Sequence, residues 1–265
     1  MTQPKGDPNE PNFSFRDADI KVRWAEKQID DLEGAIKRTL DRYSETGGCG
    51  YDAQAGIGYV TNLAMHPFHA CLAGDIIFSL RSALDCCWMG LRRAISASAS
   101  KGTLPRGTAN QVKSTIKEAT VERAFPGVQR FLLDELKAYE GGNELLWFIA
   151  QADNWNKHNM LMVVAQRTSV GSAILMFPDG LRVELENASF QGFAGGPFFS
   201  APTSGAPKWE NQSNVSFDIL LKIGKPIDER HLMPFLRAAL VDTRKGVDDF
   251  VRLFGKVVSN SASPA

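Results

Sequence analysis

Apolar residues recur at helical spacing in three long stretches of the chain. In residues 16–45 they lie three, four or seven positions apart, which is typical of a helix with one apolar face. Residues 68–96 carry a wider apolar face with few charges, so we expect this helix to be central to the core. A third such helix is predicted from Asp228 onward. The apolar positions of the three stretches are Val22, Ile29, Leu32, Ile36, Leu40 and Tyr43; Leu72, Ile76, Leu80, Leu84, Cys87, Trp88 and Leu91; and Leu232, Leu236, Leu240, Val247, Phe250 and Phe254.

Shorter helices are predicted between the second and third of these. Two of them, at 110–124 and 127–140, are divided by Pro126 and Gly127. A further helix should begin after Asn143, because asparagine is a good N-cap, and should run towards His158.

The apolar period changes to two in the second half of the chain, which predicts strands. Apolar and polar residues alternate at 161–165 and 181–186, and residues 172–177 are continuously apolar. The turn Pro178-Asp179-Gly180 separates the last two segments, which therefore read as antiparallel strands with one wet face. The alternation from Val215 to Ile223 is the clearest of all.

Two less regular segments complete the pattern. Residues 51–59 alternate briefly, which suggests a short strand or hairpin. Residues 191–214 are rich in Gly, Pro, Ser and Asn, and we expect a long surface loop there.

No internal repeat and no clean linker divides the apolar pattern. We therefore predict a single α+β domain over residues 13–255, made of a mainly helical layer with a small antiparallel β-sheet. Residues 1–12 and 256–265 lack apolar residues able to offset the entropy of ordering, so both are predicted to be disordered tails.

Composition narrows the functional classes. Lys and Arg total 30 and so do Asp and Glu, whereas a protein that coats nucleic acid usually carries a basic excess. A local basic groove remains compatible with this neutrality. No uncharged apolar run reaches membrane-spanning length and the start has no apolar signal core, so no membrane partner is expected. The four cysteines form no CxxC pair, which favours reduced thiols and a cytoplasmic location.

The first cluster with chemical potential lies in the central apolar helix. Arg81 and Asp85 are four residues apart and share a helix face among apolar neighbours. One interpretation is a partly desolvated ion pair that fixes the register of the helix. The other is an arginine held ready for an anion or phosphate, with Asp85 orienting its guanidinium.

The second cluster lies where a helical pattern gives way to a strand. Asp153 and Lys157 are four apart in the favourable order, and Asn154 and His158 share a face in the same way. These pairs, with Lys157 and His158 suiting the helix dipole, make a complete structural explanation. The functional alternative is that His158 transfers protons, while Lys157 and Asn154 contact a substrate.

Metal and cofactor chemistry have weak support. His66, His69 and Cys71 are close in sequence, but a proline separates the histidines and no fourth ligand is evident, so no metal is predicted. The sequence has no P-loop, GxGxxG, HExxH or GxSxG motif, and no cofactor is expected.

The two polar clusters resemble a widespread set of bacterial and phage proteins that carry a helix of the form GDxLHNLRSALDHL and a later DKHR-type segment. The matching residues are Gly74, Asp75, Leu80, Arg81, Ser82, Ala83, Leu84, Asp85, Asn154, Lys157, His158, Leu161, Val163 and Val164. The resemblance covers roughly residues 16–255 and includes the order of the predicted elements. It brings no established biochemical role with it.

The family helix is also similar to the motif of HEPN ribonucleases, in which an Arg is followed by a His. That resemblance implies metal-free RNA cleavage, often across a dimer. In this chain Cys86 stands at the position of the His, and Phe78 and Ser79 replace a further His and Asn. With these replacements, the HEPN resemblance implies an RNA-cleaving or formerly RNA-cleaving protein, linked to phage defence or a mobile element.

Two functional hypotheses follow. In the first, Arg81, Asp85 and His158 form a catalytic site, Lys157 and Asn154 bind the substrate, and RNA is the partner. In the second, the chain is a non-catalytic interaction module, homodimeric in one version, and its polar clusters are structural. A third, weaker candidate is a phosphate-binding or small-molecule-binding protein that uses Arg81, Lys157 and His158. Any catalytic reading requires Arg81 and His158 to line one open cleft.

Overall fold

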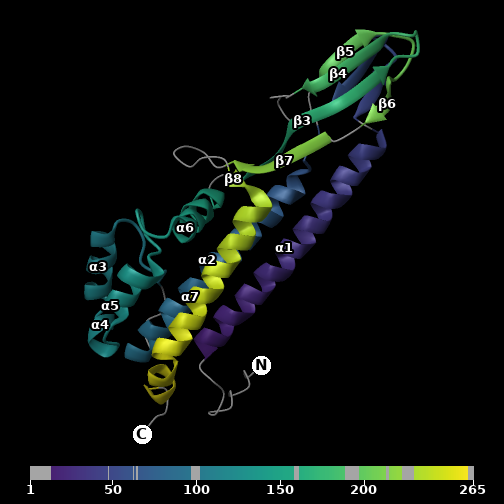
Figure 1. Ribbon diagram of the computed structural model, residues 1–265. Helices are drawn as coiled ribbons and strands as arrows, with labels where there is room; N and C mark the ends of the chain where they lie inside the picture. The colour runs from purple at the N-terminus through teal and green to yellow at the C-terminus, as the bar shows by residue number, and fades with distance from the viewer. Residues whose placement is uncertain are drawn as a thin grey trace, which may run out of the picture. The chain divides into compact units, whose positions relative to one another are not determined.

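The computed structural model describes residues 13–46, 48–61, 63, 65–96, 102–157, 161–188, 197–212, 215–222 and 230–261. It confirms the predicted class, because the chain is α+β and mainly helical, with antiparallel sheets (Figure 1). The contacts separate two compact units, one of residues 1–29, 74–159 and 234–265, and the other of residues 30–73 and 160–233. The single domain predicted over residues 13–255 stays a prediction.

The first unit is helical. It contains parts of three long helices, α1 (Phe13–Thr46), α2 (Pro67–Ile95) and α7 (Leu232–Ser261). The shorter elements are α3 (Ala109–Glu118), α4 (Val121–Ala124), α5 (Val128–Arg130), the π-helix η1 (Phe131–Leu136) and α6 (Glu144–Asn156).

Helix α2 is central to this unit, as its wide apolar face predicts. Leu80, Leu84 and Trp88 are almost completely buried. Helix α7 comes very close to α2 at Gly246, where an added Cβ would lie 3.2 Å from Leu84 Cδ2 and 2.8 Å from Leu136 Cδ1. Burial of each such large apolar side chain stabilises the fold by roughly 1.5–3 kcal/mol, so this contact line is a main source of stability.

Aromatic side chains bind α7 to the shorter helices. Phe131 of η1 meets Phe250 edge to face at 4.8 Å between ring centroids. Phe148 of α6 meets Phe235 at 4.7 Å in the same manner. Asn143 caps α6 as predicted, since its Oδ1 accepts from the Leu146 amide at 3.0 Å.

The two helices predicted at 110–124 and 127–140 are more broken than their patterns indicate. Helix α3 ends at Glu118 and Thr120 adopts a left-handed conformation with φ of 54°, which stops one continuous helix. After the predicted break at Pro126 and Gly127, the chain forms the π-helix η1, which is wider than an α-helix. The next residue, Lys137, is also left-handed and stops it. Apolar spacing cannot reveal such local backbone choices, because they depend on what each turn packs against.

The second unit holds every strand among the described residues, and they form two antiparallel sheets. One sheet has the order β1-β2-β5, and the other has β4-β3-β7-β8 with β6 also paired to β3. The strands are β1 (Cys49–Asp52), β2 (Ile57–Thr61), β3 (Met162–Met176), β4 (Arg182–Ala188), β5 (Pro197–Pro202), β6 (Lys208–Gln212), β7 (Val215–Lys222) and β8 (Arg230–His231).

Local chemistry explains the β3–β4 hairpin. Gly180 adopts a positive φ of 87° in the predicted turn, and its amide donates to the Phe177 carbonyl at 3.0 Å. Leu175 and Phe177 are buried together with Val60 of β2, so alternate residues of the continuously apolar stretch face an apolar core here.

Three sequence predictions need correction. The loop expected at 191–214 is wrong for β5 and β6, because backbone pairing with β2 and β3 outweighs a loop-like composition. Helix α7 begins at Leu232 and not at Asp228, since β8 pairs with β7 just before it. Helix α7 also continues to Ser261, into the predicted tail at 256–265, because no proline interrupts its elongation.

The predicted tail at residues 1–12 and the last part of the other tail, residues 262–265, lie outside the described residues. Within the part of the chain that is described, no helix combines the length and apolar character needed to cross a bilayer.

Candidate functional site

Arg81 is a buried charge at the centre of the first unit. Arg81 as a whole is only 2% exposed to solvent. The Nη2 atom donates to the Leu104 carbonyl at 2.6 Å and lies 3.0 Å from Asp85 Oδ1. The same Asp85 oxygen accepts from the Leu104 amide at 2.8 Å. Arg81 and Asp85 together therefore hold both polar groups of one peptide residue against α2.

The second polar cluster lies next to the first. Gly74 of α2 packs against α6 so closely that an added Cβ would lie 2.4 Å from Asn156 Nδ2. On α6, buried Asp153 accepts from Lys157 Nζ at 2.6 Å. Arg81 and Asp85 both interact electrostatically with Asp153. Asp153 and Lys157 of the second cluster thus lie close enough to act on Arg81 and Asp85, and Arg106 is a further cation that acts on Arg81.

Burial dominates the electrostatics of the Arg81–Asp85 pair. Desolvation lowers the pKa of Arg81, against the attraction of Asp85. Desolvation likewise raises the pKa of Asp85, against the attraction of Arg81 and the bond from the Leu104 amide. In the described part of the chain, the buried Arg81 Nη1 has no hydrogen-bond partner. The pair is therefore costly to bury and depends on every contact it has.

The other predicted site residues are only partly placed. Lys157 has a half-exposed side chain and Asn154 is exposed. His158 lies outside the described residues, so its meeting with Arg81 stays a prediction, and so do the catalytic and substrate-binding roles. What the structure does establish is that Arg81 is closed in by its own chain.

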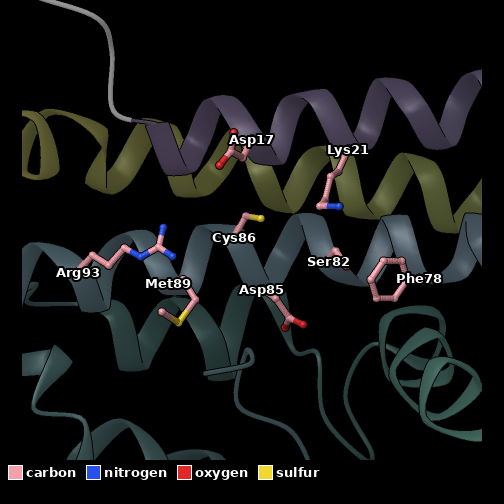
Figure 2. Close-up of a pocket in the computed structure, with 8 residues that line it drawn as sticks. All are labelled: Asp17, Lys21, Phe78, Ser82, Asp85, Cys86, Met89 and Arg93. Atoms are coloured by element: carbon pink, nitrogen blue, oxygen red, sulfur yellow. The ribbon is translucent and has the colours of Figure 1, made fainter. Parts of the chain in front are cut away.

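A groove of about 280 Å³ runs beside this network between α1 and α2, and Figure 2 shows it. Asp85 links the two, because it pairs with Arg81 and also lines the groove. Figure 2 places Asp17 and Lys21 on α1 and the other six lining residues on α2. The lining residues are Asp17, Lys21, Phe78, Ser82, Asp85, Cys86, Met89 and Arg93.

Sequence reasoning did not single out Asp17, Lys21 or Arg93. Asp17 and Lys21 are four residues apart and so share a helix face, but only the packing of α1 on α2 shows that this face borders Asp85 and Cys86.

The surroundings of Cys86 favour the thiol over the thiolate. Burial raises its pKa, and burial raises the pKa of the neighbouring Cys87 well above the ordinary value. A reactive cysteine instead has a lowered pKa in an electropositive setting. Cys86 therefore does not supply the proton-transfer chemistry that a histidine at this position would offer.

His69, considered above as a metal ligand, is held by contacts within the fold. His69 is buried, its Nδ1 lies 3.0 Å from the His66 carbonyl oxygen, and its Nε2 lies 3.5 Å from Thr39 Oγ1. Among the residues with described positions, no three His, Cys, Asp or Glu side chains gather as a metal site.

Comparison with known proteins identifies no relative: no family model, no curated protein and no solved structure matches this chain.

Proposed function

We propose that this chain is a HEPN-like helical protein that works as a non-catalytic interaction module in the cytoplasm. In this proposal the arginine that would serve RNA cleavage has become part of the scaffold. One observation carries it: Arg81 is 2% exposed and is held by Asp85 and by the Leu104 carbonyl. An arginine that stabilises a phosphate in a transition state must instead aim its donors at the reacting group.

The chemistry of the neighbouring residues supports the same conclusion. Metal-free cleavage needs a proton-transfer group besides a cation, and such a group works best with a pKa near the operating pH. Cys86, at the position that resembles the HEPN histidine, has a pKa raised by burial. Two carboxylates, Asp85 and Asp153, already pair with Arg81 and Lys157, so neither cation is left without a counter-charge for a phosphate.

RNA cleavage remains the second candidate, because Asp85 lines the groove beside two cations, Lys21 and Arg93. In that version Arg81 would stabilise charge, Asp85 would orient it, and His158 would transfer the proton. Lys157 and Asn154 would contact the RNA. Self-association would then place two such grooves in one assembly.

The test compares wild type with Arg81→Ala and His158→Ala. Purified proteins are incubated with a fluorogenic single-stranded RNA, and their thermal unfolding is followed in parallel. Arg23→Ala serves as the matched control, because Arg23 is an exposed arginine paired to Asp19 one turn away. We expect no cleavage by wild type and a large fall in unfolding midpoint for Arg81→Ala alone.

The opposite pattern would overturn the proposal. If wild type cleaves RNA, and Arg81→Ala and His158→Ala abolish cleavage with unchanged midpoints while Arg23→Ala retains it, the chain is a ribonuclease.

A further inference from the structure

The groove of Figure 2 is lined by two cations and two carboxylates that keep the capacity to bind further groups. Asp17, Lys21 and Arg93 form no ion pair with any of the described residues. Asp85 uses its Oδ1 atom for Arg81 and for the Leu104 amide, and within the described residues its Oδ2 atom accepts no hydrogen bond. Charges of both signs are therefore available to one small ligand.

Asp17 and Lys21 stay apart although their spacing favours a pair. They are four residues apart on α1, with the carboxylate on the N-terminal side, which is the favourable order. Asp19 and Arg23 have the same spacing on the same helix and do pair, at 2.9 Å. Lys21 Nζ instead lies 5.5 Å from the centre of the Phe78 ring of α2. The packing of α1 on α2 thus holds the two charges open toward the groove.

The four charges surround Cys86 in a definite order. Burial raises the pKa of the Cys86 thiol most, and the charges of Lys21, Asp17, Asp85 and Arg93 all act on it as well. Figure 2 shows Lys21 toward the Phe78 end of the groove and the Arg93 guanidinium at the other end, directed along α2 toward Cys86. The carboxylates of Asp17 and Asp85 lie between these cations. A matching ligand has a positive group at its centre and a negative group toward one end.

The size and the apolar part of the lining narrow the ligand further. The volume of about 280 Å³ lies just below the range of about 300–1,000 Å³ that is typical of pockets for drug-sized ligands, so the ligand is small. Phe78, which is 46% exposed, and Met89 offer apolar contacts on either side of Cys86. Two extended residues span about 7 Å, which suits a ligand that reaches from the carboxylates to the guanidinium.

We propose that the groove binds a small zwitterion with apolar side chains, of about the size of a dipeptide. Its ammonium group lies between Asp17 and Asp85, and its carboxylate pairs with Arg93. Its apolar side chains cover Phe78 and Met89. This inference goes beyond the proposed function, which concerns Arg81 and not the groove.

A ligand with charges of only one sign fits the same lining less well. The phosphates of an RNA strand would be attracted by Lys21 and Arg93 but repelled by the two carboxylates between them. A purely cationic ligand would meet the opposite problem at both ends of the groove. A zwitterion satisfies both kinds of charge without adding net charge to the site.

The first experiment measures which charges of the ligand are needed. Isothermal titration calorimetry of the full chain compares leucyl-phenylalanine with its N-acetyl form, which lacks the ammonium, and with its C-terminal amide, which lacks the carboxylate. For a ligand of about 20 non-hydrogen atoms we expect a dissociation constant of about 10–100 µM. Each blocked form should bind at least about tenfold more weakly.

The second experiment tests the charges of the groove with a matched control. Asp17→Asn/Arg93→Gln removes one carboxylate and one cation of the lining, and Asp19→Asn/Arg23→Gln removes the exposed pair on α1, so both variants keep the net charge of wild type. The groove variant should bind leucyl-phenylalanine at least about tenfold more weakly, and the control should bind it within about twofold of wild type. Asp85 is left intact because it also holds Arg81.

The third experiment places the ligand at the groove and needs no variant. Iodoacetamide modification of Cys86 is followed by mass spectrometry, with exposed Cys71 as the internal reference. Leucyl-phenylalanine at about ten times its dissociation constant should slow the modification of Cys86 about tenfold, by mass action, and leave that of Cys71 unchanged.

Four results would overturn the inference. They are no saturation by leucyl-phenylalanine below about 1 mM, equal binding of either blocked form, equal loss of affinity in the two double variants, and binding that leaves Cys86 unprotected. Protection of Cys86 by a single-stranded RNA and not by the dipeptide would assign the groove to nucleic acid instead. Cleavage of RNA that depends on Arg81 contradicts the proposed function alone, so the two failures can be told apart.

Discussion

Arg81 and Leu104 are joined by a hydrogen bond of 2.6 Å between residues that are 23 positions apart in the chain. The bond fixes the segment after α2 to the middle of that helix. Asp85 completes the arrangement by accepting from the Leu104 amide. A buried arginine is thereby satisfied partly by backbone, which makes its partners mutually dependent.

The first prediction concerns this dependence. Asp85→Leu should lower the free energy of unfolding by about 3–5 kcal/mol, because it leaves the buried Arg81 charge without its carboxylate. Arg81→Met combined with Asp85→Leu should cost less than Asp85→Leu alone, since no charge is then left buried. Urea unfolding measures both. If the double variant has a clearly lower free energy of unfolding than Asp85→Leu, the pair itself stabilises the fold.

The second prediction concerns pH. Desolvation raises the pKa of Asp85, so the contribution of this group is fully present below its unfolded value of about 3.9 and is lost as pH rises through the folded value. Wild type should therefore lose stability relative to Asp85→Asn as pH increases from about 3.9 upward. Urea unfolding of both proteins between about pH 3.5 and 7 tests this. A gap in favour of wild type that widens with pH would mean that the attraction of Arg81 exceeds desolvation.

The third prediction compares two helical glycines. Gly246→Ala should destabilise the fold by about 1–3 kcal/mol, because its Cβ would press on Leu84 and Leu136. Gly34→Ala should stabilise it by up to about 1 kcal/mol, since its Cβ would meet only the end of Arg38 at 3.4 Å and alanine favours helix. Chemical denaturation gives both values. The same sign for both variants would contradict the close packing of α7 on α2.

The fourth prediction orders the cysteines by reactivity. Cys71 is exposed, whereas Cys87 is buried and has a pKa raised well above the ordinary value. Iodoacetamide at about pH 8 should therefore modify Cys71 first, Cys86 slowly and Cys87 only on unfolding. Mass spectrometry of digests taken over time measures the order. Labelling of Cys86 as fast as Cys71 would instead indicate an activated thiol in the groove.

Sequence patterns predicted the elements whose determinants are local. The apolar face of α2, the cap at Asn143 and the turn at Gly180 each depend on neighbouring residues, and all three are present. Strands β5 and β6 were missed because their partners are remote and their own composition resembles a loop.

The candidate site shows the same division. The spacing of Arg81 and Asp85 predicted their pairing, and the structure confirms it. The Leu104 partner could not be predicted, because no residue pattern encodes a backbone carbonyl. The groove could not be predicted either, because it is lined by Lys21 of α1 as well as by residues of α2, the helix that carries Arg81 and Asp85.

The close contact of α7 with α2 also bears on how the chain is made. Gly246, Phe250 and Phe254 are synthesised more than 100 residues after the α2, α4 and η1 residues that they contact, Leu84, Phe125, Phe131 and Leu136. The first unit therefore cannot close during synthesis until α7 has been translated. Until then α2 exposes its widest apolar face, so the nascent protein should depend on chaperones at that stage, and chains that stop before α7 should aggregate.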